Sequence, residues 1–343
     1  MTPSPQPPAH PLPRRALTRL AATGILASAL VLTGCGAQDA LVGLHPAPAE
    51  QSVSAPLDTD GAAAVAARLL AERDALDADP KASKEARAEV LSGDALTLAT
   101  AVAGRAAGSD ATELAAAPTP TVVAQSQGRE WPRAILASTL DEDTSTQHLH
   151  VLLSEEPDEP FRVAASVPMF GGAELPAVAA ENAGSPMIEV SDGEGLPVSP
   201  EDAVGAYAAA IAHPKPKASE LVSVEDPFAT GLKATAAAQT KALGKLGTLT
   251  QTHEPRLDDA VTFRLADGGA VVFGHLKRTD TLAVKPTAKE LVLPAEYAKL
   301  TGKKKVTKSL TLNSLEPFVM VVPPAGKAEV IGASELLVSG TGR

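Results

Sequence analysis

The chain has few aromatic residues and very little cysteine. Its 343 residues include one Trp, two Tyr and six Phe, and Cys35 is the only cysteine. A single cysteine excludes any disulfide within the chain. The shortage of Trp and Tyr weakens an interpretation as a sugar-binding protein, because carbohydrate sites usually stack sugar rings on these flat side chains.

The sequence also lacks the short motifs of several enzyme classes. It has no nucleophile elbow, no phosphate-binding loop and no Cys-x-x-Cys pair. The combination of Ser-x-x-Lys, Ser-Asp-Asn and Lys-Thr-Gly that marks penicillin-recognising enzymes is absent as well. We therefore predict a protein that is not an enzyme and that carries no cofactor. The enzyme hypothesis that stays open is a hydrolase whose catalytic groups are dispersed along the sequence.

The first 34 residues have the parts of a secretory signal. Residues 1–19 are rich in proline and contain three arginines and no acid, and residues 20–32 form an apolar run. This run is too short for an ordinary spanning helix, which needs about 20 apolar residues. Arg14 and Arg15 resemble a twin-arginine export motif, so the general and the twin-arginine routes both remain open.

The apolar run ends at Leu32-Thr33-Gly34-Cys35, which resembles the bacterial lipobox. The resemblance implies that Leu32, Thr33 and Gly34 are recognised by a signal peptidase, and that Cys35 becomes the lipid-bearing first residue. Each buried methylene of its acyl chains, such as palmitate, contributes about 0.8 kcal/mol to anchoring. We therefore predict a lipoprotein on the outer face of the cytoplasmic membrane. The alternative is a free, buried cysteine after an ordinary signal.

Acidic residues outnumber basic ones, and the formal net charge is −11. Removal of residues 1–34 would leave 27 basic and 41 acidic residues, a charge of −14. This excess argues against a nucleic-acid partner and against adsorption to anionic lipid headgroups. On this interpretation the lipid on Cys35, and not charge, holds the protein at the membrane.

Composition divides the remaining chain into four parts. Residues 35–57 contain several prolines and are expected to form a flexible tether. Two α+β domains are predicted at residues 58–175 and 200–343, with a linker rich in Pro, Gly and acid at 176–199. In each domain helices precede strands, which favours helices packed on an antiparallel, curved sheet. This order resembles cystatin-like and NTF2-like domains, and the whole chain resembles uncharacterised two-domain lipoproteins of actinobacteria.

Periodicity places the elements of the first half. Residues 58–76 and 83–102 have helical spacing, and the second helix is expected to be interrupted at Ser92-Gly93. From residue 121 the apolar residues recur at every second position. This pattern predicts an antiparallel meander in which residues 141–146 form a turn.

The second half begins with a well-defined helix start. Ser199 is a cap, Pro200 suits the first turn, and Asp202 closes a capping box with Ser199. The stripe of this helix is expected to cover a sheet built from Val261, Phe263 and Leu265. If that sheet curls around the helix, Tyr207 marks the mouth of a pocket. The stripe consists of Val204, Tyr207, Ala208 and Ile211. A second helix is predicted from Asp226, and strands at 261–265, 270–278, 318–322 and 330–338.

A few polar side chains are weak candidates for a site. His148 and His150 share one strand face, a spacing that can bind a metal, with the acids 141–143 across the hairpin; the alternative is a solvent-facing pair. Lys303 and its neighbours form the one basic cluster and could meet lipid headgroups or phosphate-bearing polymers, or form a solvated loop. The other candidates, interpreted as structural, are His253, His275 and Trp131, and the lysine cluster also includes Lys304, Lys305 and Lys308.

These observations favour a protein that binds or scaffolds an unidentified envelope protein. A carrier of a small apolar ligand or lipid, held in a concave sheet, is the alternative. We predict no metal site and no catalytic residue.

Overall fold

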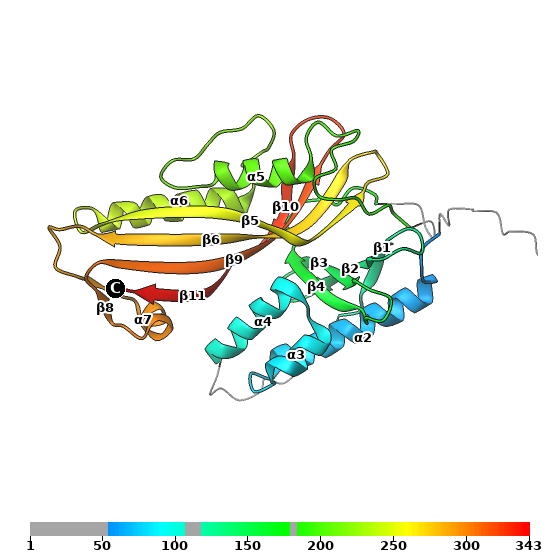
Figure 1. Cartoon of the computed structure of the whole chain (residues 1–343), viewed down its shortest axis with the longest axis horizontal. Helices are drawn as coiled ribbons and strands as arrows, with labels where there is room; N and C mark the ends of the chain where they lie inside the picture. The colour runs from blue at the N-terminus through cyan, green and yellow to red at the C-terminus, as the bar shows by residue number, and fades with distance from the viewer. Residues whose placement is uncertain (1–53, 107–117, 179–183) are drawn as a thin grey trace, which may run out of the picture. The chain divides into compact units, whose positions relative to one another are not determined.

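The computed structural model describes residues 54–106, 118–178 and 184–343 (Figure 1). Gln51–Arg343 forms one compact unit. It contains a four-stranded and a five-stranded antiparallel sheet, with helices packed on both. The predicted α+β class is confirmed. Within the described residues, no helix is long and apolar enough to cross a membrane.

The helices of the first half begin where capping residues predict. Asp58 accepts the amide of Gly61 at 2.7 Å and starts α2 (Thr59–Ala78), and Ser83 accepts the amide of Ala86 at 3.1 Å and starts α3 (Lys84–Val90). A side-chain acceptor at this position satisfies an amide that the helix leaves unpaired. The chain then breaks, and α4 (Gly93–Ala106) follows. The expected interruption at Ser92-Gly93 is therefore confirmed.

The first sheet is the predicted meander. Its strands β1 (Thr121–Gln125), β2 (Arg133–Asp141), β3 (Thr146–Ser154) and β4 (Arg162–Pro168) pair in chain order. Asp141 fixes the turn between β2 and β3 by accepting the amides of Asp143 and Thr144 at 3.0 and 3.1 Å. Apolar residues of α2 and α3 cover one face of this sheet.

The second half starts with α5 (Pro200–Ala210) and α6 (Pro227–Leu243). The hydroxyl of Ser199 accepts the amide of Asp202 at 3.1 Å, as predicted. The return bond differs from the expected one, because the Asp202 carboxylate accepts the Ser199 hydroxyl at 2.9 Å. Aspartate is one methylene shorter than the usual glutamate, which favours the nearer hydroxyl over the backbone amide.

The second sheet has longer strands than predicted. β5 (Gly247–Arg264) and β6 (Ala270–Val284) form a hairpin, and β6 also pairs with β9 (Ser309–Val322). The expected start of β5 at residue 261 is wrong by 14 residues. Residues 248–256 are mostly polar on both faces of the strand, so they show little apolar periodicity. The far edge of β9 pairs with two strands, β10 (Glu329–Ala333) and β11 (Leu336–Gly342). The small elements β7 (Leu291–Val292), α7 (Ala295–Thr301) and β8 (Lys305–Val306) lie between β6 and β9.

The two sheets share one apolar cluster, in which Leu149 and Val167 of the first sheet join Phe263 and Phe273 of the second. The expectation that the α5 stripe covers Val261, Phe263 and Leu265 is therefore wrong. The stripe packs on the opposite face of the second sheet, together with residues such as Val272, Leu276 and Met320. Side chains alternate between faces along a strand, so a helix and a sheet can occupy opposite sides of the same strands.

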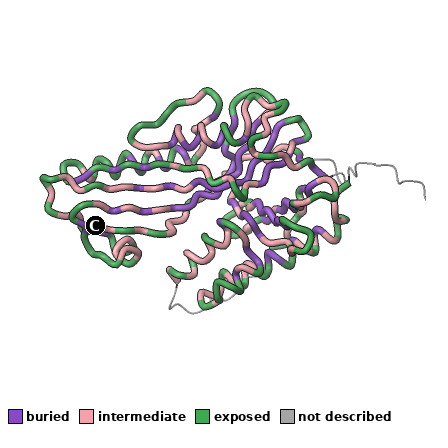
Figure 2. The backbone as a smooth tube through the Cα atoms, in the orientation of Figure 1, coloured by how far each residue is buried: buried purple, intermediate pink, exposed green. Residues whose placement is uncertain are grey.

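The predicted linker at 176–199 is connected to both sheets. Within it, the amide of Ser185 donates to the carbonyl of Gln125 at 2.8 Å, and the Ser185 hydroxyl donates to the carbonyl of Arg264 at 2.5 Å. The division into domains 58–175 and 200–343 stays a prediction. Figure 2 shows the buried backbone concentrated where the sheets share their core.

Candidate functional site

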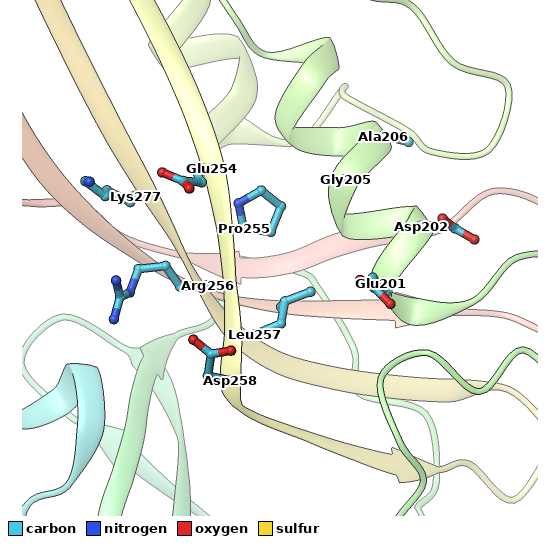
Figure 3. A pocket seen from close by; sticks show the side chains of 10 residues that line it. All are labelled: Glu201, Asp202, Gly205, Ala206, Glu254, Pro255, Arg256, Leu257, Asp258 and Lys277. Carbon is cyan, nitrogen blue, oxygen red and sulfur yellow. The ribbon is translucent and has the colours of Figure 1, made fainter.

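The main candidate site is a groove between α5 and the edge strand β5 (Figure 3). Its volume of about 680 Å³ is in the range of small-molecule sites. Such sites are mostly apolar, whereas six of the ten residues here are charged. The groove therefore suits a polar or charged partner better than an apolar ligand. Its residues are Glu201, Asp202, Gly205 and Ala206 of α5, Glu254, Pro255, Arg256, Leu257 and Asp258 of β5, and Lys277 of β6.

A bulge in β5 shapes this groove. Arg256 pairs with His275 and Val261 with Phe273, so four residues of β5 lie opposite the single residue Gly274. Leu257 fills the space above Gly274, where an added Cβ would stand only 3.2 Å from the leucine Cδ2. Such an insertion bends the strand. In Figure 3, Leu257 projects toward α5 while Arg256 projects to the other side of the strand.

The Arg256 side of the bulge meets the start of α4. The Arg256 Nε donates to Asp94 Oδ2 at 2.8 Å, and Asp94 is only 7% exposed. Gly93 has φ of +53°, and an added Cβ would lie 2.4 Å from Asp259 Oδ2. A side chain at residue 93 would therefore both strain the backbone and collide with the bulge. These contacts fix α4 against β5.

His275 completes this cluster. Its Nδ1 lies 3.9 Å from Asp94 Oδ2, which is beyond hydrogen-bond distance. Burial, opposed by the nearby Asp94, lowers the pKa of His275 to about 4. Burial and then the Asp94 carboxylate raise the pKa of Asp259. A neutral histidine without an aligned carboxylate, beside an aspartate already bound to Arg256, is poorly arranged for general base catalysis.

A second hollow gathers candidates that the sequence singled out. It lies beside the β2–β3 turn and is lined by Asp141, Glu142, Asp143 and His148, together with Asp74 of α2 and several neighbours. The rings of His148 and His150 stack with 6.2 Å between their centroids. The predicted proximity of the two histidines and the acidic turn is confirmed for His148.

His150 is buried, with both ring nitrogens occupied. Its Nε2 lies 2.8 Å from Thr139 Oγ1, and its Nδ1 lies 2.9 Å from Ser166 Oγ and 3.2 Å from an Arg73 nitrogen. Because an arginine only donates, Nδ1 is the acceptor and the proton is assigned to Nε2. Burial and then Arg73 lower the pKa of His150 to about 2. No lone pair is left for a metal.

Metal ligands and the lysine cluster were also weighed from the sequence. Among the residues that the structure describes, no group of three or more His, Cys, Asp or Glu side chains is arranged to hold a metal. Lys303, Lys304 and Lys308 are exposed, and Lys305 pairs with Glu290 at 2.8 Å. Trp131 is half-buried and carries the Arg133 guanidinium 3.6 Å from its ring centroid.

Tyr207 does not lie at an open pocket mouth. It is 1% exposed, and its hydroxyl donates to the Asp226 carboxylate, with 3.1 Å to each oxygen. Asp226 also caps α6 by accepting the amide of Ala229 at 2.8 Å. Burial and then Asp226 raise the pKa of Tyr207. The expectation of a pocket mouth is wrong because α5 packs directly onto the sheet, and the hydroxyl finds a polar partner instead of solvent.

A row of charged groups buried in the second sheet was not predicted from the sequence. Glu316 is 0% exposed and contacts His253 Nδ1 at 2.9 Å and Arg278 at 3.1 Å. Arg278 also contacts Asp280 at 3.2 Å and pairs with Glu335. The missed signal was the alternation of side chains along a strand: residues 278 and 280 fall on the same strand face as the apolar residues 276 and 282. His253 is structural, as interpreted.

The predicted lipidation segment, Leu32, Thr33, Gly34 and Cys35, lies outside the described residues. No curated protein and no solved structure matches the chain. Residues 126–342 match a family described as a domain of unknown function, DUF8094. This match covers more than half of the chain, including both sheets from β2 onward, and the chain therefore belongs to the DUF8094 family.

Proposed function

We propose that this protein is an exported, lipid-anchored lipoprotein whose folded part binds a polar or charged partner, with no catalytic role, at the outer face of the cytoplasmic membrane. The observation that carries the binding role is the charged lining of the groove between α5 and β5. Both signs of charge line it, with Arg256 and Lys277 beside four acids. Complementary charge gives specificity and fast association with a macromolecular partner.

The geometry of the buried histidines supports a non-enzymatic role. His150 is held neutral with both nitrogens bonded, and the Nδ1 of His275 is 3.9 Å from its nearest carboxylate. A catalytic base needs an available nitrogen close to the proton that it removes. Both residues instead connect helices to sheets through buried contacts.

The alternative role, a carrier of a small apolar ligand, has less support. A carrier needs a concave site lined mainly by apolar side chains. The groove includes Lys277 and the hollow beside the β2–β3 turn includes Arg73, and two further hollows next to the start of α6 both include Glu225. The apolar faces of both sheets are occupied by the protein's own side chains.

Anchoring is tested by metabolic labelling with a fatty acid. We expect label on the parent protein and none on the Cys35→Ala variant, because Cys35 is the single thiol of the chain. The variant should accumulate as a soluble protein or as an uncut precursor. Label that persists on Cys35→Ala contradicts lipidation at this residue.

The binding role is tested by photo-crosslinking in intact cells. A photoreactive residue at Glu201, in the groove, is compared with one at Gln239, which is exposed on α6. We expect discrete products from position 201 that disappear when Glu254 and Asp258 are changed to alanine. Identical products from both positions would show that the groove has no specific partner.

A further inference from the structure

One end of the second sheet carries a third of the basic residues of this acidic protein. The basic end consists of residues 241–247, 284–309 and 343. It contains ten of the 30 basic residues and two of the 41 acidic ones, so its side chains carry +8 while the rest of the chain carries −19. The basic residues are Lys241, Lys245, Lys285, Lys289, Lys299, Lys303, Lys304, Lys305, Lys308 and Arg343.

Backbone and side-chain hydrogen bonds hold these segments together. The Lys285 amide donates to the carbonyl of Leu246 at 2.9 Å, and the Thr287 hydroxyl donates to that of Lys245 at 3.0 Å, which joins the end of α6 to the end of β6. The amide of Val284 donates to the carbonyl of Lys308 at 2.8 Å. The amide of Lys308 donates to the carbonyl of Arg343 at 2.9 Å. The tertiary structure therefore collects charges that are up to about one hundred residues apart in sequence.

Most of these cations have no acidic partner. In the part of the chain that the structure describes, the one ion pair of the basic end joins Lys305 and Glu290. Lys285 donates its ammonium to the carbonyl of Gly244, and Lys299 to that of Arg105. The other seven basic residues are exposed: Lys241, Lys245, Lys289, Lys303, Lys304, Lys308 and Arg343. Such a group of like charges is unfavourable within the fold alone.

Two apolar side chains project at the same end. Val292 is 77% exposed and Leu246 is 49% exposed. They lie at the same end because their chain neighbours Leu291 and Gly247 are close together: a Cβ added at Gly247 would lie 3.6 Å from Leu291 Cδ1. Exposed apolar groups amid lysines are typical of surfaces that insert shallowly among lipid headgroups. A soluble polyanion would recognise the lysines but gain little from Val292.

We propose that the basic end docks onto the anionic headgroups of a lipid bilayer, with Val292 and Leu246 entering the interface. Charges are screened beyond about 8 Å at physiological salt, so the excess acid elsewhere in the chain does not cancel this local attraction. Each lysine near an anionic surface contributes about a fivefold gain in binding. This contact goes beyond the lipid on Cys35 and does not require it.

The test uses Gln51–Arg343, which is one compact unit and lacks the signal and Cys35. Sedimentation with vesicles of 30 mol% phosphatidylglycerol in phosphatidylcholine should show binding that weakens with added salt, and pure phosphatidylcholine vesicles should bind poorly. The variant Lys303→Gln/Lys304→Gln/Lys308→Gln should bind about 100-fold more weakly. The matched control, Lys84→Gln/Lys215→Gln/Lys217→Gln, loses the same charge from exposed lysines elsewhere and should bind like the parent.

Two outcomes would overturn the proposal. Equal loss of binding in the two triple lysine variants would show that only net charge matters. Soluble poly(glycerol phosphate) that binds the parent as tightly as the vesicles do, with no effect of Val292→Ser/Leu246→Ser on either, would assign the surface to an anionic polymer. Circular dichroism and thermal melting establish that every variant is folded before binding is compared.

Discussion

The strands β5, β6 and β9 pass through two different environments along their length. Residues 270–276 of β6 are buried without interruption, because the first sheet covers one face and α5 the other. Beyond residue 276 the same strand alternates between buried and partly exposed residues, and β5 does so from residue 247 to 252. One part of the sheet is an inner layer, and the other is an arm with one open face.

The two parts use different side chains for the same backbone structure. Across the open face of the arm, Thr250, Thr281, Thr311 and Thr341 lie directly opposite one another on four strands. Threonine is a good strand former that tolerates water, so it maintains a sheet where no second layer covers it. The inner layer instead has Phe, Val and Leu on both faces. Strand formation therefore does not require burial of both faces. A run of apolar residues that marks the strand in the sequence appears only where both faces are buried.

The largest effect is expected when the chain is cut between the two sheets. We expect limited proteolysis to cleave first within residues 176–199, where Pro, Gly and acidic residues are frequent. The two fragments should stay associated in size-exclusion chromatography, because they share an apolar cluster that neither covers alone. Fragments that separate and remain folded would establish two independent domains.

Removal of an inner-layer aromatic side chain tests the stability of the shared core. Phe263→Ala should lower the free energy of unfolding by about 3 to 5 kcal/mol, since Phe263 is 0% exposed. The matched change in the arm, Thr281→Ala, should stay within about 0.5 kcal/mol. Urea denaturation measures both. Similar values for the two variants would mean that the inner layer and the arm contribute equally.

The charged interior of the arm can be tested by removing one partner. Glu316→Ala should cost about 3 kcal/mol, because it leaves His253 and Arg278 buried with one carboxylate fewer. Glu335→Ala removes a half-exposed partner of the same arginine and should cost less than about 1 kcal/mol. If the two losses are equal, burial does not set the strength of these contacts.

A pH titration probes the junction of the arm with α4. Because burial keeps the pKa of His275 at about 4, below its unfolded value of about 6.5, the unfolded chain binds more protons between these pH values. The contribution of His275 to stability is complete above pH 6.5 and falls by up to about 3 kcal/mol as the pH drops to 4. His275→Gln should reduce this pH dependence. His150 contributes in the same direction, so only the difference from the parent reports on His275; an unchanged slope would contradict the assignment.

The smallest expected effect concerns the helix that covers the inner layer. Ser199→Ala removes the cap of α5 and should cost about 1 kcal/mol. Thermal melting compares it with Ser219→Ala, whose hydroxyl accepts the amide of Leu221 in a loop. A loss at residue 199 no larger than at residue 219 would show that packing alone fixes α5.

Local signals were sufficient for the order and type of most elements. Capping residues such as Asp58, Ser83, Ser199 and Asp226 start helices where predicted, and alternating apolar residues locate the first sheet. The arm was underestimated because its outward residues are threonines and its inward row includes His253, Arg278 and Glu316. Charged residues in a strand look solvent-facing unless their partners on other strands are known.

The candidate groove was not foreseen either. Its charged residues come from α5, β5 and β6, and the sequence offered no reason to bring Glu201 and Lys277 together. The β5 bulge that shapes it depends on the pairing of Arg256 with His275 across the hairpin. Likewise, the net charge of the chain argues against binding to anionic lipid, whereas the distribution of charge in the structure favours such binding at the basic end.

The sequence by itself determined the α+β class, the helix starts and the first meander, because turns, caps and periodicity act over a few residues. The export signal, the lipid on Cys35 and the two-domain division remain predictions made at that level. Only the tertiary structure decided that α5 and the first sheet cover opposite faces of the second sheet, that Tyr207 bonds to Asp226, and that seven exposed cations meet at one end. Those arrangements depend on contacts between residues far apart in the chain, which no local pattern encodes.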